Sequence, residues 1–441
     1  MKNLLDRIGL GRPDLRAWAM YDWANSAYQT TIIAAVFPVY YRLVAGSGLE
    51  KNVATARLAW ASAIAIMIVA ILAPILGAIA DSSPVKKRML AAFMAIGVAS
   101  CFGMFWITDG DWALALTLFI IGNVGVAGSI VFYESLLPHL VGPKDLDKVS
   151  SAGYAIGYLG GGVLLAINAM MIQKPDWFGI ADTGTATRLA FVSVGIWWLA
   201  FSIPLFLKVA EPRALVNENP QPVSISGGFR QLAGTFRELR KYRQALLFLA
   251  AFLIYNDGIQ TMIRMATIYG EGIGIDTGAM ITALLLTQFI GVPAAFAFGA
   301  LASKIGAKAG ILIGLAVYAV ITVLGYYMTS AAHFFALAIL VGLVQGGTQA
   351  LSRSVYASMI PRQKSSEFFA IFSVFERYAG VLGPLLFGAV ITWTGSGRSA
   401  ILAILIFFVA GAALLLPVDI EAGRRQARAD EEQLGMADGK W

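Results

Sequence analysis

A carboxylate, two amides and several hydroxyl groups lie close together in one apolar stretch of the chain. Asp22, Ser26 and Gln29 are spaced so that they share one face of a helix, and Asn25 lies beside that face. Lipid cannot satisfy such groups, so the face must line a cavity or contact another helix. Ionisable residues in a bilayer usually serve an ion or substrate path. We therefore interpret Asp22 as a proton carrier, and Asn25, Tyr28 and Gln29 as substrate ligands.

A second apolar stretch carries a similar set of polar residues. Asn256 and Gln260 share a helix face, and Asp257 follows Asn256 near the middle of the stretch. Tyr255 adds an aromatic surface that can pack an apolar group or stack on a cation. We interpret Tyr255, Asn256 and Gln260 as substrate ligands and Asp257 as a second proton carrier. The alternative for both stretches is a polar seam that only clamps helices together.

Charged residues also occur in other apolar stretches. Glu376 and Arg377 are adjacent, so their side chains point about 100° apart on a helix and are expected to find different partners. We interpret Arg377 as the cation for a substrate carboxylate, and Glu376 as a site for a proton or an ammonium group. A structural ion pair between helices is the alternative. Glu134 and Arg353 lie near predicted helix ends, where a gating salt bridge is favoured over substrate contact.

The composition excludes a disordered chain and disfavours a soluble enzyme. Of the 441 residues, 58% are hydrophobic and 13% are charged, and the mean hydropathy is +0.72. A typical soluble domain has about 25% charged residues. The apolar excess must face lipid, so the chain is predicted to be an all-α integral membrane protein. The net charge of +7 does not indicate nucleic-acid binding, because the basic residues gather in alternate loops.

Hydropathy and length predict twelve transmembrane helices, since each needs about 20 apolar residues. Their expected bounds are residues 16–41, 57–80, 88–107, 112–136, 150–172, 188–207, 243–268, 279–302, 309–328, 332–356, 366–394 and 399–416. Most of the 33 Lys and Arg residues fall in the two termini and in the loops on the same side of the membrane. By the positive-inside rule, both termini are predicted to be cytoplasmic.

The first six spans and the last six repeat one another. The matching segments are Asn25-x-x-x-Gln29-Thr30 with Asn256-x-x-x-Gln260-Thr261, Gly77-x-x-x-Asp81 with Gly299-x-x-x-Ser303, and Tyr133-x-Ser135-x-x-Pro138 with Tyr356-x-Ser358-x-x-Pro361. Repeated six-helix halves are typical of secondary transporters. We therefore predict an N-terminal bundle (1–207), a cytoplasmic linker (208–242), a C-terminal bundle (243–416) and a mobile cytoplasmic tail (417–441). The linker contains either a short basic amphipathic helix or only a solvated segment.

Glycine and proline mark places where helices approach closely or bend. Gly153, Gly157 and Gly161 recur at intervals of four residues in the span 150–172, which lets a neighbouring backbone approach. Pro384, in the span 366–394, removes one helix hydrogen bond and permits a bend. Plain tight packing and a moving hinge both fit this pattern.

The first polar stretch also carries a family signature. Tyr21-Asp22-Trp23-Ala24-Asn25-Ser26-Ala27-Tyr28, followed by Phe37-Pro38-Val39-Tyr40, resembles the signature of the Unknown Major Facilitator family of the major facilitator superfamily. That family is related to the autophagy-linked vacuolar amino-acid effluxers of fungi, and the likeness covers nearly the whole chain. It implies the major facilitator fold, with two six-helix bundles that rock between inward- and outward-facing states. It also implies that Asp81 helps to latch the cytoplasmic side, although Ser82 and Pro84 depart from the superfamily's loop motif.

These features predict a secondary active transporter for a small polar or zwitterionic, amino acid-like solute, with efflux and proton coupling favoured. The alternatives are an exporter of an amphipathic drug or lipid and, in another class, a non-transporting membrane sensor or scaffold. The chain has no phosphate loop or catalytic constellation, and His139 and His333 lack a second ligand at metal spacing, so no enzyme activity, cofactor or metal is expected. The expected partners are the substrate, protons and the lipids of a bacterial inner membrane, for a monomeric protein.

Overall fold

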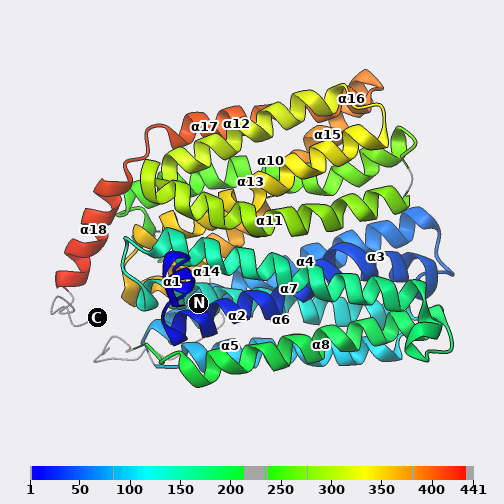
Figure 1. Ribbon diagram of the computed structural model, residues 1–441, viewed down its shortest axis with the longest axis horizontal. Coiled ribbons are helices and arrows are strands. Elements are labelled where there is room, and N and C mark those ends of the chain that lie inside the picture. The colour runs from blue at the N-terminus through cyan, green and yellow to red at the C-terminus, as the bar shows by residue number, and fades with distance from the viewer. Residues whose placement is uncertain are drawn as a thin grey trace. The chain divides into compact units, whose positions relative to one another are not determined.

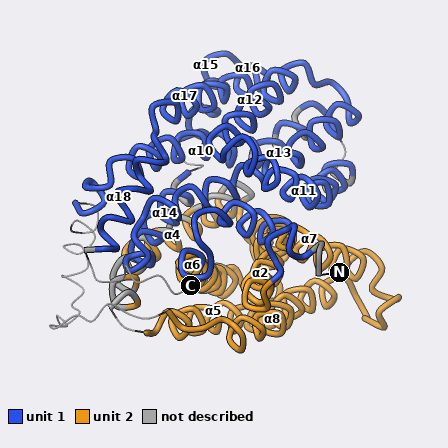
Figure 2. The backbone as a smooth tube through the Cα atoms, turned by 60° about the vertical axis from the view of Figure 1, so that its left-hand side comes forward, with its two compact units in different colours: residues 1–11, 137–155, 233–441 blue, residues 12–136, 156–232 orange. Residues whose placement is uncertain are grey.

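The structure is a computed structural model, and the regular elements in its described part are all helices (Figure 1). It describes residues 2–82, 84–212, 234, 237–275, 277–379 and 382–433. The structure describes the backbone of Asp81 and Arg377 but not their side chains. The chain forms two compact units, coloured in Figure 2. Unit 1 comprises residues 1–11, 137–155 and 233–441, and unit 2 comprises residues 12–136 and 156–232.

Unit 2 contains helices from the first half of the chain. They are α2 (Pro13–Ala27), η1 (Tyr28–Ala35), α3 (Val36–Tyr40), η2 (Tyr41–Ala45), α4 (Lys51–Ser82), α5 (Lys86–Gly103), η3 (Met104–Trp106), most of α6 (Trp112–Leu140) and α7 (Leu146–Gln173), η4 (Pro175–Phe178) and α8 (Thr183–Lys208). Local sequence explains the helix starts: Pro13 opens α2, and the Asp182 side chain caps α8 by accepting from the Thr185 amide at 2.8 Å. Hydrogen bonds from the Thr185 side chain and backbone lower the pKa of Asp182 from its ordinary value.

Unit 1 contains the helices of the second half together with the adjoining ends of α6 and α7. The helices are α1 (Lys2–Arg7), α10 (Arg243–Gly272), α11 (Thr277–Ile305), α12 (Ala307–Tyr326), α13 (Ala331–Ser358), η5 (Arg362–Lys364), α14 (Ser365–Tyr378), α15 (Leu382–Thr394), α16 (Gly397–Ala403), α17 (Leu405–Leu415) and α18 (Ile420–Gln433). Figure 1 shows α10, α11, α12 and α13 running alongside one another in this unit.

Each predicted span coincides with one helix or with consecutive helices. Within the described residues, nine helices are long and apolar enough to cross a membrane. The all-helical membrane class is therefore supported, while the count of twelve and the side of the termini stay predictions. The predicted linker 208–242, with its amphipathic segment, lies largely outside the described residues.

Four predicted spans are not single α-helices. The span 88–107 comprises α5 and the 3-10 helix η3. The span 16–41 changes from α-helix to π-helix at Tyr28 and returns to α-helix at Val36. The span 399–416 divides into α16 and α17, and the span 366–394 divides into α14 and α15. In the last case α14 ends at Tyr378, and Ala379 has an extended ψ of 133°. The bend predicted near Pro384 is thus a complete interruption of the helix.

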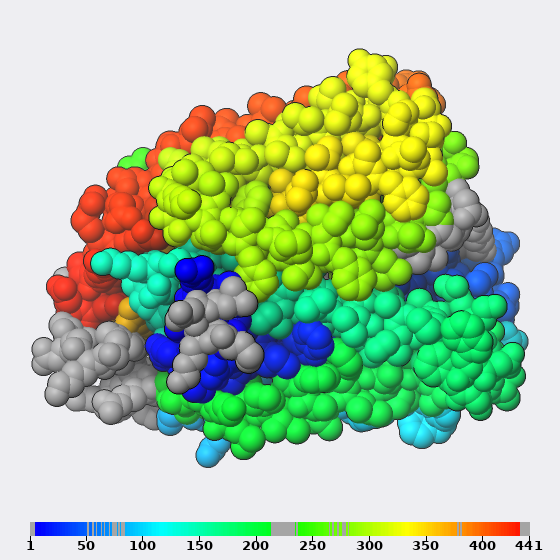
Figure 3. Space-filling model, in the orientation of Figure 1, coloured from blue at the N-terminus to red at the C-terminus, as the bar shows by residue number. Residues whose placement is uncertain are grey.

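The outer faces of several helices are apolar, as a lipid environment requires. On α8 the exposed large apolar side chains recur at helical spacing, at Ile196, Leu199, Ile203 and Leu207. On α12, Ile313, Val320 and Val323 are exposed in the same way. In Figure 3 the visible surface of α12 is in yellow tones and that of α8 is in green.

The two halves of the chain share a lysine contact at equivalent positions. Lys87 of α5 donates from Nζ to the carbonyl oxygens of Phe206 and Val209, at 2.9 and 2.6 Å, at the end of α8. Lys308 of α12 donates in the same way to Leu416 and Val418, at 2.6 and 2.8 Å, after α17. A cation satisfies carbonyl groups that a helix C-terminus leaves without partners. The repeat seen in the sequence is therefore also present in the contacts.

Candidate functional site

The Asp22 side chain lies beside a tyrosine of α6. Tyr133 donates from its hydroxyl to Asp22 Oδ2 at 2.7 Å. The Trp18 ring stacks on Tyr133 with centroids 4.6 Å apart, and the Trp18 indole donates to the Tyr133 carbonyl at 3.2 Å. Tyr21 packs on the same ring at 4.9 Å. These contacts leave the Tyr133 ring little freedom, so its hydroxyl is fixed on the carboxylate.

The same face of α2 packs closely against α7. A Cβ atom at Gly160 would lie 2.5 Å from the Trp23 carbonyl oxygen, so only glycine permits the observed approach. Thr30 donates from its hydroxyl to the Gly161 carbonyl at 3.2 Å. A Cβ atom at Gly157 would meet the Ser26 hydroxyl at 2.7 Å. The predicted glycine pattern is therefore a close helix contact; we call this region the α2–α7 seam.

The other substrate ligands predicted on the first stretch have different environments. Asn25 is 4% exposed, and its amide donates to the Tyr21 carbonyl one turn earlier in the same helix at 3.0 Å. Tyr28 is buried, with its ring 5.7 Å from that of Trp198. Gln29 is half-buried. Their roles as substrate ligands stay predictions.

Asp257 is fully buried in α10, and its carboxylate meets the first turn of α15. Its Oδ2 accepts from the Leu382 amide at 3.0 Å, and its Oδ1 accepts from the Gly383 amide at 2.8 Å. Thr261, one turn further along α10, donates from its hydroxyl to Oδ1 at 3.2 Å. We call this contact the α10–α15 cap. It satisfies backbone N–H groups that a helix N-terminus leaves without partners.

The remaining predicted residues of the second stretch make contacts with two neighbouring helices. Tyr255 is fully buried, and its hydroxyl lies 2.6 Å from the Ser352 hydroxyl of α13. The Asn256 amide donates to the Glu376 carbonyl at 3.4 Å, at the end of α14. The structure thus brings Asn256, Asp257 and the main chain of Glu376 together around the interruption of the span. Gln260 is half-buried, and the Arg377 side chain lies outside the description.

The predicted gating residue Arg353 contacts a helix from the first half of the chain. Its guanidinium donates to the Ser150 hydroxyl and carbonyl, each at 2.9 Å, and lies 4.4 Å from the Tyr154 ring centre. Ser150 and Tyr154 belong to the segment of α7 that lies in unit 1. Glu134 is buried in α6 of unit 2. The predicted gating role of Asp81 falls on a side chain outside the description.

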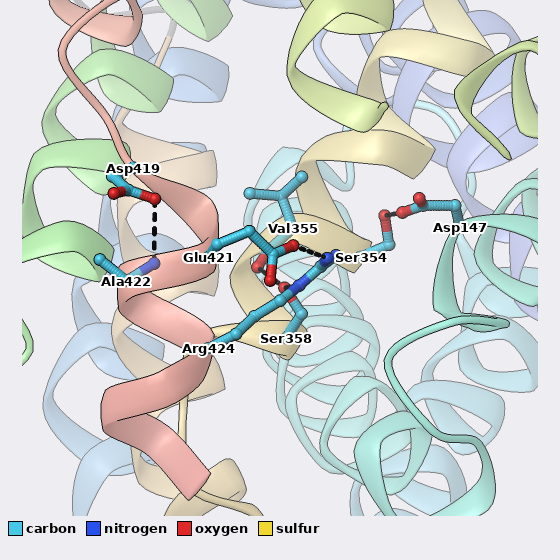
Figure 4. Close-up of polar contacts among 8 residues, drawn as sticks. All are labelled: Asp147, Ser354, Val355, Ser358, Asp419, Glu421, Ala422 and Arg424. Atoms are coloured by element: carbon cyan, nitrogen blue, oxygen red, sulfur yellow. Dashed lines mark hydrogen bonds and ion pairs between the residues drawn. The ribbon is translucent and has the colours of Figure 1, made fainter. Parts of the chain in front are cut away.

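Next to Arg353, the ends of α7, α13 and α18 share further polar contacts (Figure 4). Ser354 of α13 donates to Asp147 of α7. Arg424 of α18 donates to the Ser358 hydroxyl at 3.1 Å and to Glu421 at 2.7 Å. Figure 4 shows Arg424 extending from α18 toward the end of α13, where Ser354 and Ser358 lie one turn apart.

The prediction of a mobile tail is wrong for Ile420–Gln433, which form a packed helix. The Arg362 amide donates to Glu431 at 2.9 Å, and Tyr242 donates to Asp430. Burial and the hydrogen bond to Asp430 raise the pKa of Tyr242 from its ordinary value. The tail is rich in charge, and Arg424, Asp430 and Glu431 bind groups on neighbouring elements, so α18 packs against them.

Sequence reasoning did not identify Tyr133, Thr261, Gly383 or Asp147 as site residues. Tyr133 and Thr261 belong to the repeated segments, so their recurrence was an available signal. Gly383 contributes only its backbone amide, and a main-chain donor leaves no mark in a side-chain pattern.

The sequence matches a known family over most of its length. Residues 43–428 match the family described as vacuole effluxer Atg22 like. An uncharacterised MFS-type transporter, YxiO of Bacillus subtilis, is 34% identical over 402 residues, which cover 90% of this chain and 93% of that protein. Autophagy-related protein 22 of Yarrowia lipolytica is 28% identical over 311 residues, covering 64% of this chain and 51% of that protein.

Solved structures similar to this chain include major facilitator superfamily transporters. The proton:xylose symporter XylE, bound to a sugar analogue, superposes with a TM-score of 0.67 at 15% identity, covering 91% of this chain and 94% of that one. The transporter FucP in its outward conformation gives a TM-score of 0.67 at 13% identity, covering 92% and 99%. At such low identity the likeness supports the fold alone.

Proposed function

Since the chain belongs to the Atg22-like vacuole effluxer family of major facilitator transporters, we propose that it exports a small polar or zwitterionic solute in exchange for protons. The transport cycle is alternating access, in which the two six-helix halves rock about a shared substrate site. The membrane is a bacterial inner membrane, both termini face the cytoplasm, and the protein acts as a monomer.

One observation carries the proton part of this proposal: an acidic side chain lies within the first membrane helix of each half. Asp22 is held by the Tyr133 hydroxyl, and Asp257 is fully buried against the N-terminus of α15. A carboxylate in this environment is retained for an ion or substrate path more often than for stability. Asp22, Asp257 and Glu376 are the proposed proton-binding groups.

The proposed substrate class rests on the types of polar residue in the predicted spans. A zwitterion needs a cation for its carboxylate and an acid for its ammonium group. Arg377 would supply the first, and Asp22, Asp257 or Glu376 the second. The proposed polar ligands are Asn25, Gln29, Asn256 and Gln260, and Tyr28 and Tyr255 would pack the apolar part of the solute.

We assign gating to contacts between residues of the first and second halves of the chain, at the proposed cytoplasmic end. Arg353 of the second half binds Ser150 of the first half through two hydrogen bonds. Such contacts must break when the cytoplasmic side opens, so Arg353 is proposed as a gate residue. Glu134 and Asp81 are proposed to act with it.

Transport by purified protein in liposomes tests the proposal. The vesicles carry a pH-sensitive dye and an imposed pH gradient, and a panel of radiolabelled amino acids is offered. We expect uptake of at least one amino acid into the vesicles, with protons moving in the opposite direction. Asp22→Asn and Asp257→Asn should each abolish gradient-driven uptake while preserving counterflow exchange. Gly388→Ala is the matched control, because a Cβ atom at Gly388 would meet nothing within 4 Å.

The other outcomes would identify a different function. Flux of a hydrophobic drug or a lipid, with none of any amino acid, would indicate an amphipathic exporter and overturn the substrate class. Binding without flux would indicate a sensor or scaffold. Unchanged coupling in both asparagine variants would remove the proton role from Asp22 and Asp257.

A further inference from the structure

We propose that Asp257 is a positioning residue that closes the interruption between α14 and α15, and that its protonation opens this cap and frees α15 to move. The inference rests on the proposed proton coupling and specifies how a proton at Asp257 changes the structure. It assigns the moving element to α15, beside the predicted substrate ligands Asn256 and Arg377.

A single carboxylate accepts hydrogen bonds from the first backbone N–H groups of α15. The first two residues, Leu382 and Gly383, donate their amides to the two different oxygens of Asp257. The third residue, Pro384, has no amide hydrogen to satisfy. A helix N-terminus needs acceptors for its first N–H groups, and residues from another helix can supply them. Asp257 thus acts for α15 as a cap residue contributed by α10.

The contact between Asp257 and α15 leaves no room for a side chain at residue 383. A Cβ atom at Gly383 would lie 1.8 Å from the Thr261 hydroxyl and 2.8 Å from Asp257 Oδ1. Gly388, in the same helix, would meet nothing within 4 Å. The close fit is therefore confined to the first turn of α15, where the carboxylate binds.

The internal repeat gives an independent reason to connect Asp257 with the interruption. Aligning Asn25-x-x-x-Gln29-Thr30 with Asn256-x-x-x-Gln260-Thr261 places Ser26 at the position of Asp257. Ser26 lies against Gly157 in the continuous helix α7, whose amides at that level are used within the helix. Asp257 faces an interrupted helix with free amides. Asp257 therefore occurs in the half whose facing helix offers backbone amides to bind it.

Protonation changes what this side chain can accept. An ionised carboxylate accepts at both oxygens, whereas a protonated one carries a donor on one of them. Three donors point at Asp257: the amides of Leu382 and Gly383 and the Thr261 hydroxyl. A proton on either oxygen removes the negative charge that strengthens these hydrogen bonds and turns one acceptor position into a donor. The hold on the first turn of α15 is weakened, and in our proposal this turn then shifts.

Few other ionisable groups in the neighbouring helices could act in place of Asp257. Helices α15 and α17 contain no Asp, Glu, His, Lys or Arg. Helix α14 contains Glu367 in its first turn and Glu376 and Arg377 near its end, and α13 contains His333 in its first turn and Arg353 near its end. The variants below therefore include Glu376→Gln as a comparison.

Hydrogen exchange measured by mass spectrometry tests the cap directly, in the full-length protein in detergent or nanodiscs. Protection is calculated for the amides of Leu382 and Gly383 at about pH 7.5 and about pH 5, after correction for the intrinsic pH dependence of exchange. We expect the wild-type protection factor to fall by about tenfold at the lower pH, because opening exposes these amides. Asp257→Asn should give low protection at both pH values, whereas Glu376→Gln and Gly388→Ala should resemble wild type.

Proton-driven flux in liposomes is measured on the same variants. This second measurement distinguishes failure of the cap inference from failure of the proposed function. Loss of coupling together with loss of pH-dependent protection in Asp257→Asn supports the inference. If wild-type protein couples flux to protons but protection of the two amides is the same at both pH values, opening of the cap is not the coupling step. If wild-type flux does not depend on the pH gradient but amide protection still falls at low pH, the proposed function is overturned. The cap would then respond to pH without coupling transport to protons.

Discussion

The α2–α7 seam and the α10–α15 cap occupy equivalent places in the two halves, yet different interactions hold them. In the first half, glycines let a continuous helix approach, and Ser26 lies against Gly157. In the second half the facing helix is interrupted, and the carboxylate of Asp257 binds its free amides. The lysine contacts of Lys87 and Lys308, by contrast, are alike in both halves.

The comparison shows that the two halves share the lysine contact at the helix ends and differ at the position of Ser26 and Asp257. A carbonyl group at a helix end needs a donor in either half, so a lysine serves both. The interruption of the facing helix creates amide donors in the second half, and that half carries Asp257 where the first half has Ser26. Each of the following predictions tests one part of this contrast.

The largest effect is expected from Asp257→Ser, which gives the second half the residue of the first. Two amides of α15 lose a carboxylate acceptor, and each buried N–H group without a partner costs about 1–3 kcal/mol. The free energy of unfolding should fall by about 2–5 kcal/mol. Tryptophan fluorescence during denaturant unfolding in detergent measures this. A change within about 0.5 kcal/mol, which is typical of an uninvolved surface site, would show that the carboxylate does not support α15.

Gly160→Ala should be the next most damaging change, because its Cβ atom would lie 2.5 Å from a backbone carbonyl that cannot turn away. Overpacking of this kind costs about 1–3 kcal/mol. The thermal unfolding midpoint in detergent should fall, while Gly388→Ala in α15 should leave it unchanged. Equal midpoints for the two alanine variants would contradict the close helix approach at the α2–α7 seam.

A double-mutant cycle on Asp22 and Tyr133 should give a smaller energy. The hydroxyl donates to the carboxylate at 2.7 Å, and hydrogen bonds to charged groups contribute about 1.5–3 kcal/mol. Because Asp22 is only half-buried, we expect a coupling energy of about 1 kcal/mol between Asp22→Asn and Tyr133→Phe. Strictly additive effects would show that the two side chains act independently.

The smallest effects are expected from Lys87→Ala and Lys308→Ala. Each removes a cation from a helix C-terminus, which is typically worth about 0.3–1 kcal/mol. The two losses of unfolding free energy should agree with each other within measurement error, since both lysines bind two carbonyl groups at a helix end. A large loss at only one of them would show that the ends of the repeats have diverged as well.

Much of the architecture could be predicted from residue pattern because lipid imposes it. Every helix buried in lipid must satisfy its own backbone, so apolar length alone indicates where each span lies. The predicted span 243–268 accordingly corresponds to α10, and 332–356 to α13. The pattern could not place the interruption after Tyr378, because Gly380, Gly383 and Pro384 are compatible with a bend as well as with a break.

The candidate site was predicted less completely than the architecture. The sequence singled out Asp22 and Asp257 because a carboxylate in an apolar stretch is costly. It did not indicate that Tyr133 binds the first or that Leu382 and Gly383 bind the second. Those partners are distant in the chain, and two of the three donors are backbone amides.

What the sequence by itself determined is the all-helical membrane class, the internal repeat and the identity of the buried acids, since each follows from local composition and spacing. Only the tertiary structure decided what those acids bind. Hydrogen-bond partners depend on which helices pack together and where one of them is interrupted, and packing joins residues separated by more than a hundred positions in the chain.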